Sequence, residues 1–155
     1  MKKINWDLTD FYKNLTDPKI SKDKTQIEKL TSAFIKKYKT KINSPKVNSK
    51  ILLTSLIDYQ NLLEKLSILE NYSALIFSTD TNNEKVKAFY QSVQEFSTKI
   101  NSEVLWFQLE LIGISTDQFK KLTKNNSLQE FSHFLQEMHY VCVIIPRRSV
   151  FSRHF

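Results

Sequence analysis

Apolar residues recur at helical spacing along most of the chain, and the longest such stretch runs from Ile51 to Asp80. Within it, the apolar positions widen into a stripe that can contact two neighbouring elements at once. The members of this stripe are Leu52, Leu56, Tyr59, Leu62, Leu63, Leu66, Leu69 and Ile76. Each buried side chain contributes roughly 1.5–3 kcal/mol, so this helix would supply a large share of the core. We predict that it is the central element of the fold.

A second long helix is predicted directly after it. The polar run Ser78–Asn83 contains side chains that compete for backbone hydrogen bonds, which is typical of a segment that ends one helix and caps the next. Apolar residues then alternate at spacings of three and four, at Val86, Phe89, Val93, Phe96, Ile100, Val104, Phe107 and Leu111. Two long helices joined by a short polar turn indicate an antiparallel pair. Tyr90 and Trp106 flank the apolar row, where we expect packing rather than ligand binding.

The residues before this pair predict a plug and a third helix. Trp6, Leu8, Phe11 and Tyr12 form an apolar segment that we expect to lie across the bundle. Asp17-Pro18 fits an N-cap followed by proline at the first helical position. One helix face then follows, made of Ile20, Ile27, Leu30, Phe34 and Tyr38. A loop with proline and cap-type residues, Asn43–Ser49, separates this helix from the central one.

Two shorter helices are predicted near the end of the chain. Gly113 suits the position just past a helix end, where glycine adopts left-handed backbone most easily. Ser115–Gln118 and Ser127–Glu130 both have capping-box spacing, so a helix should begin at each. The apolar anchors of these helices are Phe119, Leu122, Leu128, Phe131, Phe134, Leu135 and Met138.

The amino-acid composition narrows the fold class and the cellular location. One Gly and three Pro leave few residues for tight turns, which disfavours sandwiches and barrels. We predict an all-α fold, an antiparallel helical bundle built on a long central helical hairpin with two short C-terminal helices. Cys142 is the only cysteine, and no apolar run has the length of a leader or a membrane span. We therefore expect a cytoplasmic protein that does not bind a membrane.

The net charge of +7 raises the question of nucleic-acid binding. Twenty of the twenty-three basic residues are Lys, and the three Arg, at 147, 148 and 153, all lie within the last nine residues. Phosphate-binding surfaces usually concentrate positive charge and use the forked donors of Arg. A body rich in Lys with acids interspersed is more typical of a solvated surface, so we expect no nucleic-acid partner.

The sequence predicts no catalytic, cofactor-binding or metal-binding residue. Glu130, His133 and Glu137 share the face of a helix, and Glu-x-x-His spacing occurs in di-iron bundles. Such a site needs a second Glu-x-x-His motif and two further Glu, and neither His139 nor His154 has a Glu three residues before it. The His-Glu-x-x-His pattern of zinc peptidases and the Gly-rich phosphate loop are both absent from the sequence. We interpret the cluster as solvated side chains.

Four segments together resemble a known family. Trp6–Tyr12, Asp17–Ile20, Asn71–Asn82 and Phe107–Leu111 occur in the order found in the N-terminal part of oligoendopeptidase F, a zinc metallopeptidase of the M3 (thimet-like) family. The resemblance covers residues 6 to about 140. No single segment is diagnostic, whereas the ordered set is fairly specific.

This resemblance implies a helical N-terminal domain at residues 1–140 that belongs to a much longer peptidase. In that family the zinc-binding His-Glu-x-x-His helix lies in the C-terminal half, so zinc and the hydrolysis of oligopeptides belong to the full-length relative. None of the family's metal or catalytic positions has a counterpart in this sequence. The chain is therefore expected to be inactive alone, with the missing catalytic domain as its partner.

Residues 141–155 differ in composition from the rest of the chain. They contain the only Cys, all three Arg and no acidic residue. One hypothesis is that a frameshift near residue 140 replaced the original continuation with an unrelated basic tail; the alternative is a genuine C-terminal strand or basic tail. Two other functions also stay open, namely a stand-alone helical interaction module and, less favoured, a basic nucleic-acid binder.

Overall fold

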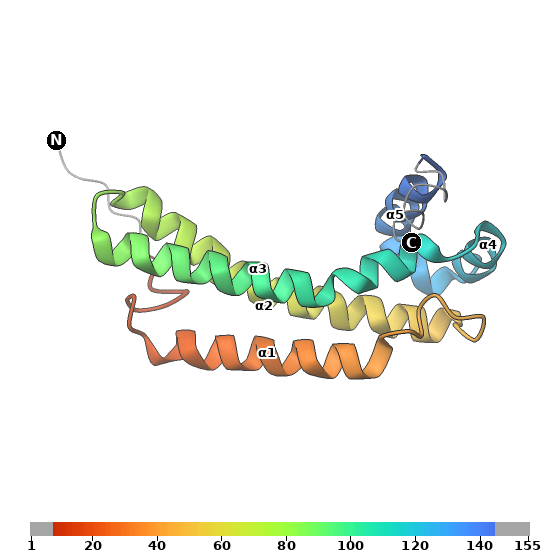
Figure 1. Cartoon of the computed structure of the whole chain (residues 1–155), viewed down its shortest axis with the longest axis horizontal. Coiled ribbons are helices and arrows are strands. Elements are labelled where there is room, and N and C mark those ends of the chain that lie inside the picture. The colour runs from red at the N-terminus through yellow and green to blue at the C-terminus, as the bar shows by residue number, and fades with distance from the viewer. Residues whose placement is uncertain (1–7, 145–155) are drawn as a thin grey trace, which may run out of the picture. The chain divides into compact units, whose positions relative to one another are not determined.

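The computed structural model describes residues 8–144, and every regular element in that range is a helix. In chain order the elements are α1 (Pro18–Tyr38), α2 (Ser49–Thr79), α3 (Glu84–Gly113), α4 (Thr116–Thr123), the 3-10 helix η1 (Asn126–Phe131) and α5 (Ser132–Ile144) (Figure 1). The predicted all-α class is confirmed. None of these helices is both long enough and apolar enough to cross a bilayer.

The chain forms two compact units, and α1, α2 and α3 each contribute to both. Unit 1 consists of Met1–Ala33 and Tyr59–Glu103, and unit 2 consists of Phe34–Asp58 and Val104–Phe155. Trp6 of the predicted plug and residues 145–155 of the predicted tail lie outside the described residues.

The central hairpin lies in unit 1, where α2 and α3 run antiparallel from the turn at residues 80–83 (Figure 1). Asn83 caps α3, because its side-chain oxygen accepts from the backbone N–H groups of Lys85 and Val86 at 3.0 and 3.4 Å. Near the turn, the rings of Phe77 and Tyr90 stack with centroids 4.7 Å apart. Tyr90 is thus a packing residue, as predicted.

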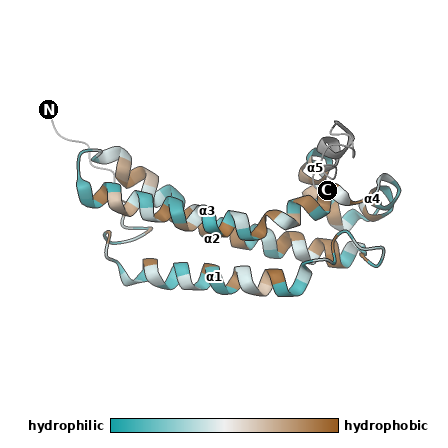
Figure 2. Cartoon of the chain, in the orientation of Figure 1, coloured by the Kyte–Doolittle hydropathy of each residue, from teal (hydrophilic) through white to brown (hydrophobic). Residues whose placement is uncertain are grey.

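The buried row of α2 agrees with the predicted stripe. Figure 2 shows hydrophobic residues recurring along α2 between hydrophilic ones. The predicted positions that are buried are Leu52, Leu56, Tyr59, Leu62, Leu66 and Leu69. Leu63 and Ile76 are half-buried. Because the most buried positions recur at spacings of three and four, one continuous face of α2 supplies the core.

The described part of the predicted plug packs within unit 1 against the helices. Leu8 and Tyr12 are buried in one cluster with Ile20, Leu69 and Tyr72. The Tyr12 ring meets the Tyr72 ring edge to face at 4.8 Å, and the Tyr12 hydroxyl donates to Asp23 at 2.9 Å. Burial and this carboxylate raise the pKa of Tyr12. The hydroxyl is therefore a fixed donor that ties the segment to α1.

The start of α1 confirms the predicted cap. The Asp17 carboxylate accepts from the backbone N–H groups of Lys13 at 2.9 Å and Lys19 at 2.8 Å. These two hydrogen bonds lower the pKa of Asp17, because they favour its charged form. Pro18 then occupies the first helical position.

Unit 2 is built around an aromatic cluster. The Phe34 ring lies 5.1 Å from the Phe107 ring and 5.5 Å from the Trp106 ring, measured between centroids. Tyr38 adds a fourth ring, 5.2 Å from Phe34. The predicted packing role of Trp106 is confirmed, since its ring contacts residues of both α1 and α3 in this unit.

Two local predictions near the end of the chain were wrong. Gly113 does not follow α3 in left-handed backbone; it is the last residue of the helix, and its φ is not positive. The second short helix is capped by Asn125 rather than Ser127, because the Asn125 side chain accepts from the Ser127 N–H at 3.0 Å. The helix that we predicted to begin at Ser127 therefore begins at Asn126, as the 3-10 helix η1 that precedes α5.

Candidate functional site

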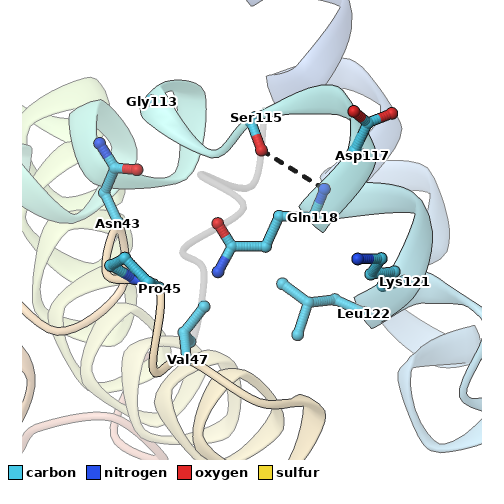
Figure 3. A pocket seen from close by; sticks show the side chains of 9 residues that line it. All are labelled: Asn43, Pro45, Val47, Gly113, Ser115, Asp117, Gln118, Lys121 and Leu122. Atoms are coloured by element: carbon cyan, nitrogen blue, oxygen red, sulfur yellow. Dashed lines mark hydrogen bonds between the residues drawn. The ribbon is translucent and has the colours of Figure 1, made fainter.

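A concave surface of unit 2 lies between the α1–α2 loop and α4 (Figure 3). It is an open cleft of about 460 Å³. Its lining comes from the loop, the end of α3 and α4, at Asn43, Pro45, Val47, Gly113, Ser115, Asp117, Gln118, Lys121 and Leu122. We refer to these nine residues as the cleft.

The loop wall of the cleft is held by one carboxylate. Glu110 of α3 accepts backbone hydrogen bonds from Thr40 at 2.6 Å, Ile42 at 2.9 Å and Asn43 at 3.3 Å. Charge-assisted hydrogen bonds of this kind are stronger than neutral ones, and three of them converge on one group. Thr40 has a φ of 69°, a left-handed conformation that turns the chain out of α1 toward Glu110.

The α4 wall begins at the predicted cap. The Ser115 hydroxyl accepts from the Gln118 N–H at 3.4 Å, as the dashed line in Figure 3 shows. The Gln118 side chain does not complete a capping box; its amide instead donates to the Ser44 carbonyl at 2.9 Å. A second link runs from the Ser49 hydroxyl to the Leu122 carbonyl at 3.1 Å. These two hydrogen bonds hold the loop wall and the α4 wall together.

Gly113 allows the loop and the end of α3 to approach closely. A Cβ atom at Gly113 would lie 2.4 Å from the Asn43 amide nitrogen and 3.0 Å from its Cγ. A side chain at Gly113 would therefore displace the Asn43 side chain, whereas the backbone conformation of Gly113 would allow one. Asn43 consequently sits at the rim of the cleft with its amide beside the helix end (Figure 3).

The chemistry of the cleft suits binding. Its lining has no His, Cys or Glu, and the Ser115 hydroxyl already serves as a helix cap. The floor includes apolar side chains from Pro45, Val47 and Leu122. Amide groups from Asn43 and Gln118, the Asp117 carboxylate and the Lys121 ammonium supply the polar groups. Such a mixture of apolar surface and a few polar groups is typical of a recognition site.

A second polar group in unit 2 joins α1 to α2. Asp58 accepts from Lys37 at 2.9 Å and from the Tyr38 hydroxyl at 2.7 Å. Burial acts to raise the pKa of Asp58, but the hydrogen bonds from Lys37 and Tyr38 outweigh it and lower the pKa. Asp58 is therefore a structural anion with both partners in place.

The Glu130, His133 and Glu137 cluster is not assembled as a metal site. Glu130 lies in η1 and the other two in α5, and the His133 and Glu137 side chains are 86% and 62% exposed. The His133 Nδ1 and Glu137 Oε2 atoms are 3.7 Å apart. Among the side chains that the structure describes, those of residues 8–138, no group of three or more His, Cys, Asp and Glu could hold a metal ion.

Comparison with protein-family models, curated proteins and solved structures found no match for this chain. The resemblance to oligoendopeptidase F thus stays a prediction based on the four segments. The cleft itself could not be found by sequence reasoning, because Ser44 and Gln118, which join its two walls, are 74 residues apart. Local sequence patterns predicted only two parts of the cleft, the Asn43–Ser49 loop and the helix cap at Ser115.

Proposed function

We propose that this chain is the helical N-terminal domain of an oligoendopeptidase F-like zinc metallopeptidase, and that it hydrolyses no peptide by itself. The observation that carries this proposal is the order of the four segments Trp6–Tyr12, Asp17–Ile20, Asn71–Asn82 and Phe107–Leu111. The all-α fold supports it, since the resemblance implies a helical domain. Asn71–Asn82 covers the end of α2 and most of the hairpin turn, and Phe107–Leu111 lies near the end of α3.

An exposed apolar face also supports this proposal. Leu105 and Leu109 are 50% and 59% exposed and lie four residues apart, on the same face of α3 in unit 2. We call this pair the apolar ridge. Ile57 of the same unit is 49% exposed. A domain separated from its catalytic partner should expose the surface on which that partner docks, and an apolar ridge is suited to that role.

In the full-length protein, zinc and the catalytic residues would come from the C-terminal domain, and short peptides would be the substrates. This chain would contribute a helical wall and no metal ligand. We further propose a cytoplasmic location, which the single cysteine supports because nothing in the sequence offers an intrachain disulfide.

Peptidase assays test the predicted inactivity. The purified chain is incubated with fluorogenic oligopeptides with and without added zinc, and its metal content is measured by atomic absorption. We expect no hydrolysis above the buffer rate and no stoichiometric zinc. Robust zinc-dependent hydrolysis that co-purifies with the chain would contradict the proposal.

A second function, a stand-alone interaction module, is favoured by the same apolar ridge. Leucines at positions i and i+4 are the spacing with which one helix anchors another. The two functions differ in what the ridge does in the isolated chain. A fragment should bind a hydrophobic dye at the ridge and self-associate weakly, whereas a module should form a defined complex of fixed stoichiometry.

Sedimentation and dye binding distinguish these two functions. The Leu105→Ser/Leu109→Ser variant is compared with Ile68→Ser, which removes a 42% exposed apolar side chain from unit 1. For a fragment, dye fluorescence falls in the ridge variant and changes little in the control. A stable homodimer that only the ridge variant disrupts would instead favour the interaction module.

A further inference from the structure

The positive charge of the described residues is concentrated in unit 2. Residues 8–33 and 59–103 of unit 1 contain nine Lys and ten acidic residues, a net charge of −1. Residues 34–58 and 104–144 of unit 2 contain nine Lys and five acidic residues, a net charge of +4. The sequence alone suggests interspersed charges, but the fold separates them.

Two segments without acidic residues meet in unit 2. No Asp or Glu lies between Glu28 and Asp58, and none lies between Asp117 and Glu130. The hydrogen bonds from Gln118 to Ser44 and from Ser49 to Leu122 place these segments side by side. Within unit 2 they carry nine exposed lysines. Leaving out Lys36 and Lys37 of α1, we call the other seven, at 39, 41, 46, 50, 120, 121 and 124, the lysine surface.

The lysine surface is not neutralised by the rest of unit 2. In the described part of the chain, none of the seven lysines forms an ion pair; the Lys–carboxylate pairs there involve Lys37, Lys87 and Lys99. Two acidic residues of unit 2, Glu110 and Asp117, lie beside these segments. The Glu110 carboxylate is taken up by three backbone N–H groups, and Asp117, which lines the cleft together with Lys121, is outnumbered by the seven lysines. The surface thus presents a net positive potential.

The cleft lies within this surface and limits the kind of anion that fits. Lys121 lines it, and Lys46 directly follows Pro45 of its wall. Its apolar floor of Pro45, Val47 and Leu122 suits aliphatic side chains, and its amides can meet peptide backbone groups. No aromatic residue lines the cleft, so bases would have no ring to stack on, and the described residues include no Arg to fork onto phosphate.

We propose that the lysine surface and the cleft together bind an acidic polypeptide segment in which Glu or Asp alternates with aliphatic residues. The aliphatic side chains lie in the cleft, and the carboxylates face the surrounding lysines. This binding does not depend on a peptidase origin of the chain, since it uses only residues of unit 2. Lysine point charges make the interaction tolerant of the exact acidic sequence and sensitive to salt.

Fluorescence anisotropy tests the proposal with a short fluorescein-labelled peptide that alternates Glu with Leu. The triple variant Lys46→Glu/Lys50→Glu/Lys121→Glu is compared with Lys22→Glu/Lys29→Glu/Lys85→Glu, which makes the same charge change on exposed lysines of unit 1. Each exposed lysine–carboxylate pair contributes a factor of about two to five, so the first variant should bind at least about tenfold more weakly. The control should bind within about twofold of the wild type. Equal losses in both variants would overturn the proposal.

Changes in the probe test the same site without altering the protein. A peptide that alternates Glu with Ser should bind more weakly, because it loses the cleft contacts, and one that alternates Lys with Leu should not bind. An oligothymidylate of equal charge should bind more weakly than the Glu-Leu peptide. Tighter binding of the oligothymidylate, or equal binding of the Ser and Leu peptides, would overturn the assignment to an acidic polypeptide. Absence of Glu-Leu peptide binding at low salt would do so as well.

Discussion

At the scale of single residues, the side chains that shape the cleft act over long sequence distances. Glu110 accepts from a loop about 70 residues earlier, and Gln118 donates to the Ser44 carbonyl in the same loop. Gly113 provides the space into which the Asn43 side chain fits. Each of these contacts fixes the loop relative to the end of α3 or to α4, so the shape of the cleft depends on a few polar groups.

Glu110→Gln should destabilise unit 2 by about 1–3 kcal/mol. The amide group places an N–H donor where a carboxylate oxygen accepts from Ile42 or Thr40, so a charge-assisted hydrogen bond is lost and a buried donor faces another donor. Urea denaturation followed by circular dichroism measures the change. Glu103→Gln is the matched control on α3, because Glu103 is exposed. Equal stability of the two variants would show that Glu110 does not hold the loop.

The lowered pKa values of Asp17 and Asp58 predict a loss of stability in acid. A carboxyl group with a lowered folded-state pKa contributes stability above its unfolded-state pKa of about 4, and that contribution disappears as the pH falls through the folded-state pKa. The folded chain should therefore lose stability as the pH falls below about 4. Both groups are partly exposed, so the Asp58 contribution is about 1 kcal/mol or less.

Asp58→Asn isolates this contribution. The variant keeps a hydrogen-bonding side chain but cannot titrate, so its melting temperature should fall less steeply between about pH 4 and pH 2 than that of the wild type. At neutral pH it should be slightly less stable, because Lys37 and Tyr38 lose a charged partner. Parallel pH profiles of wild type and variant would mean that Asp58 titrates alike in the folded and unfolded chain.

At the scale of elements, helix starts and buried faces could be predicted because their signals are local. Asp17-Pro18, Asn83 and Ser115 each satisfy backbone donors within a few residues, and the apolar spacing of α2 marks its buried face. The Asn125 cap was missed because Ser127, with Glu130 three residues after it, has the capping-box spacing, and several side-chain acceptors compete to cap one helix start. The walls of the cleft could not be predicted, since the sequence has no local mark for a contact between Ser44 and Gln118.

Leu66→Asp tests the core of the central helix. Leu66 is 2% exposed, so an unpaired carboxylate there would lose its hydration without a partner and should unfold the bundle at room temperature. Ile68→Asp is the matched control, because Ile68 lies on the same helix and is 42% exposed. That variant should keep its helical circular dichroism and change stability by less than about 1 kcal/mol. An unchanged melting temperature for Leu66→Asp would contradict the assigned buried face.

At the scale of the whole molecule, the fold and the proposed function depend on different kinds of evidence. The all-α fold follows from apolar periodicity and few Gly and Pro residues, and it is confirmed. The peptidase origin depends on the order of four segments, none of which carries catalytic chemistry. The boundary predicted at residue 140 falls inside α5, which continues to Ile144, and residues 145–155 lie outside the described part of the chain. The frameshift thus stays a prediction.

The most direct measurement of the central claim is the nucleotide sequence from codon 140 onward, read in all three frames. We expect a shifted frame that continues with helical coding and contains a downstream His-Glu-x-x-His motif. That result would make this chain the N-terminal remnant of a zinc peptidase. Coding that shows no such motif in any frame would contradict the claim, and the interaction module would become the favoured function.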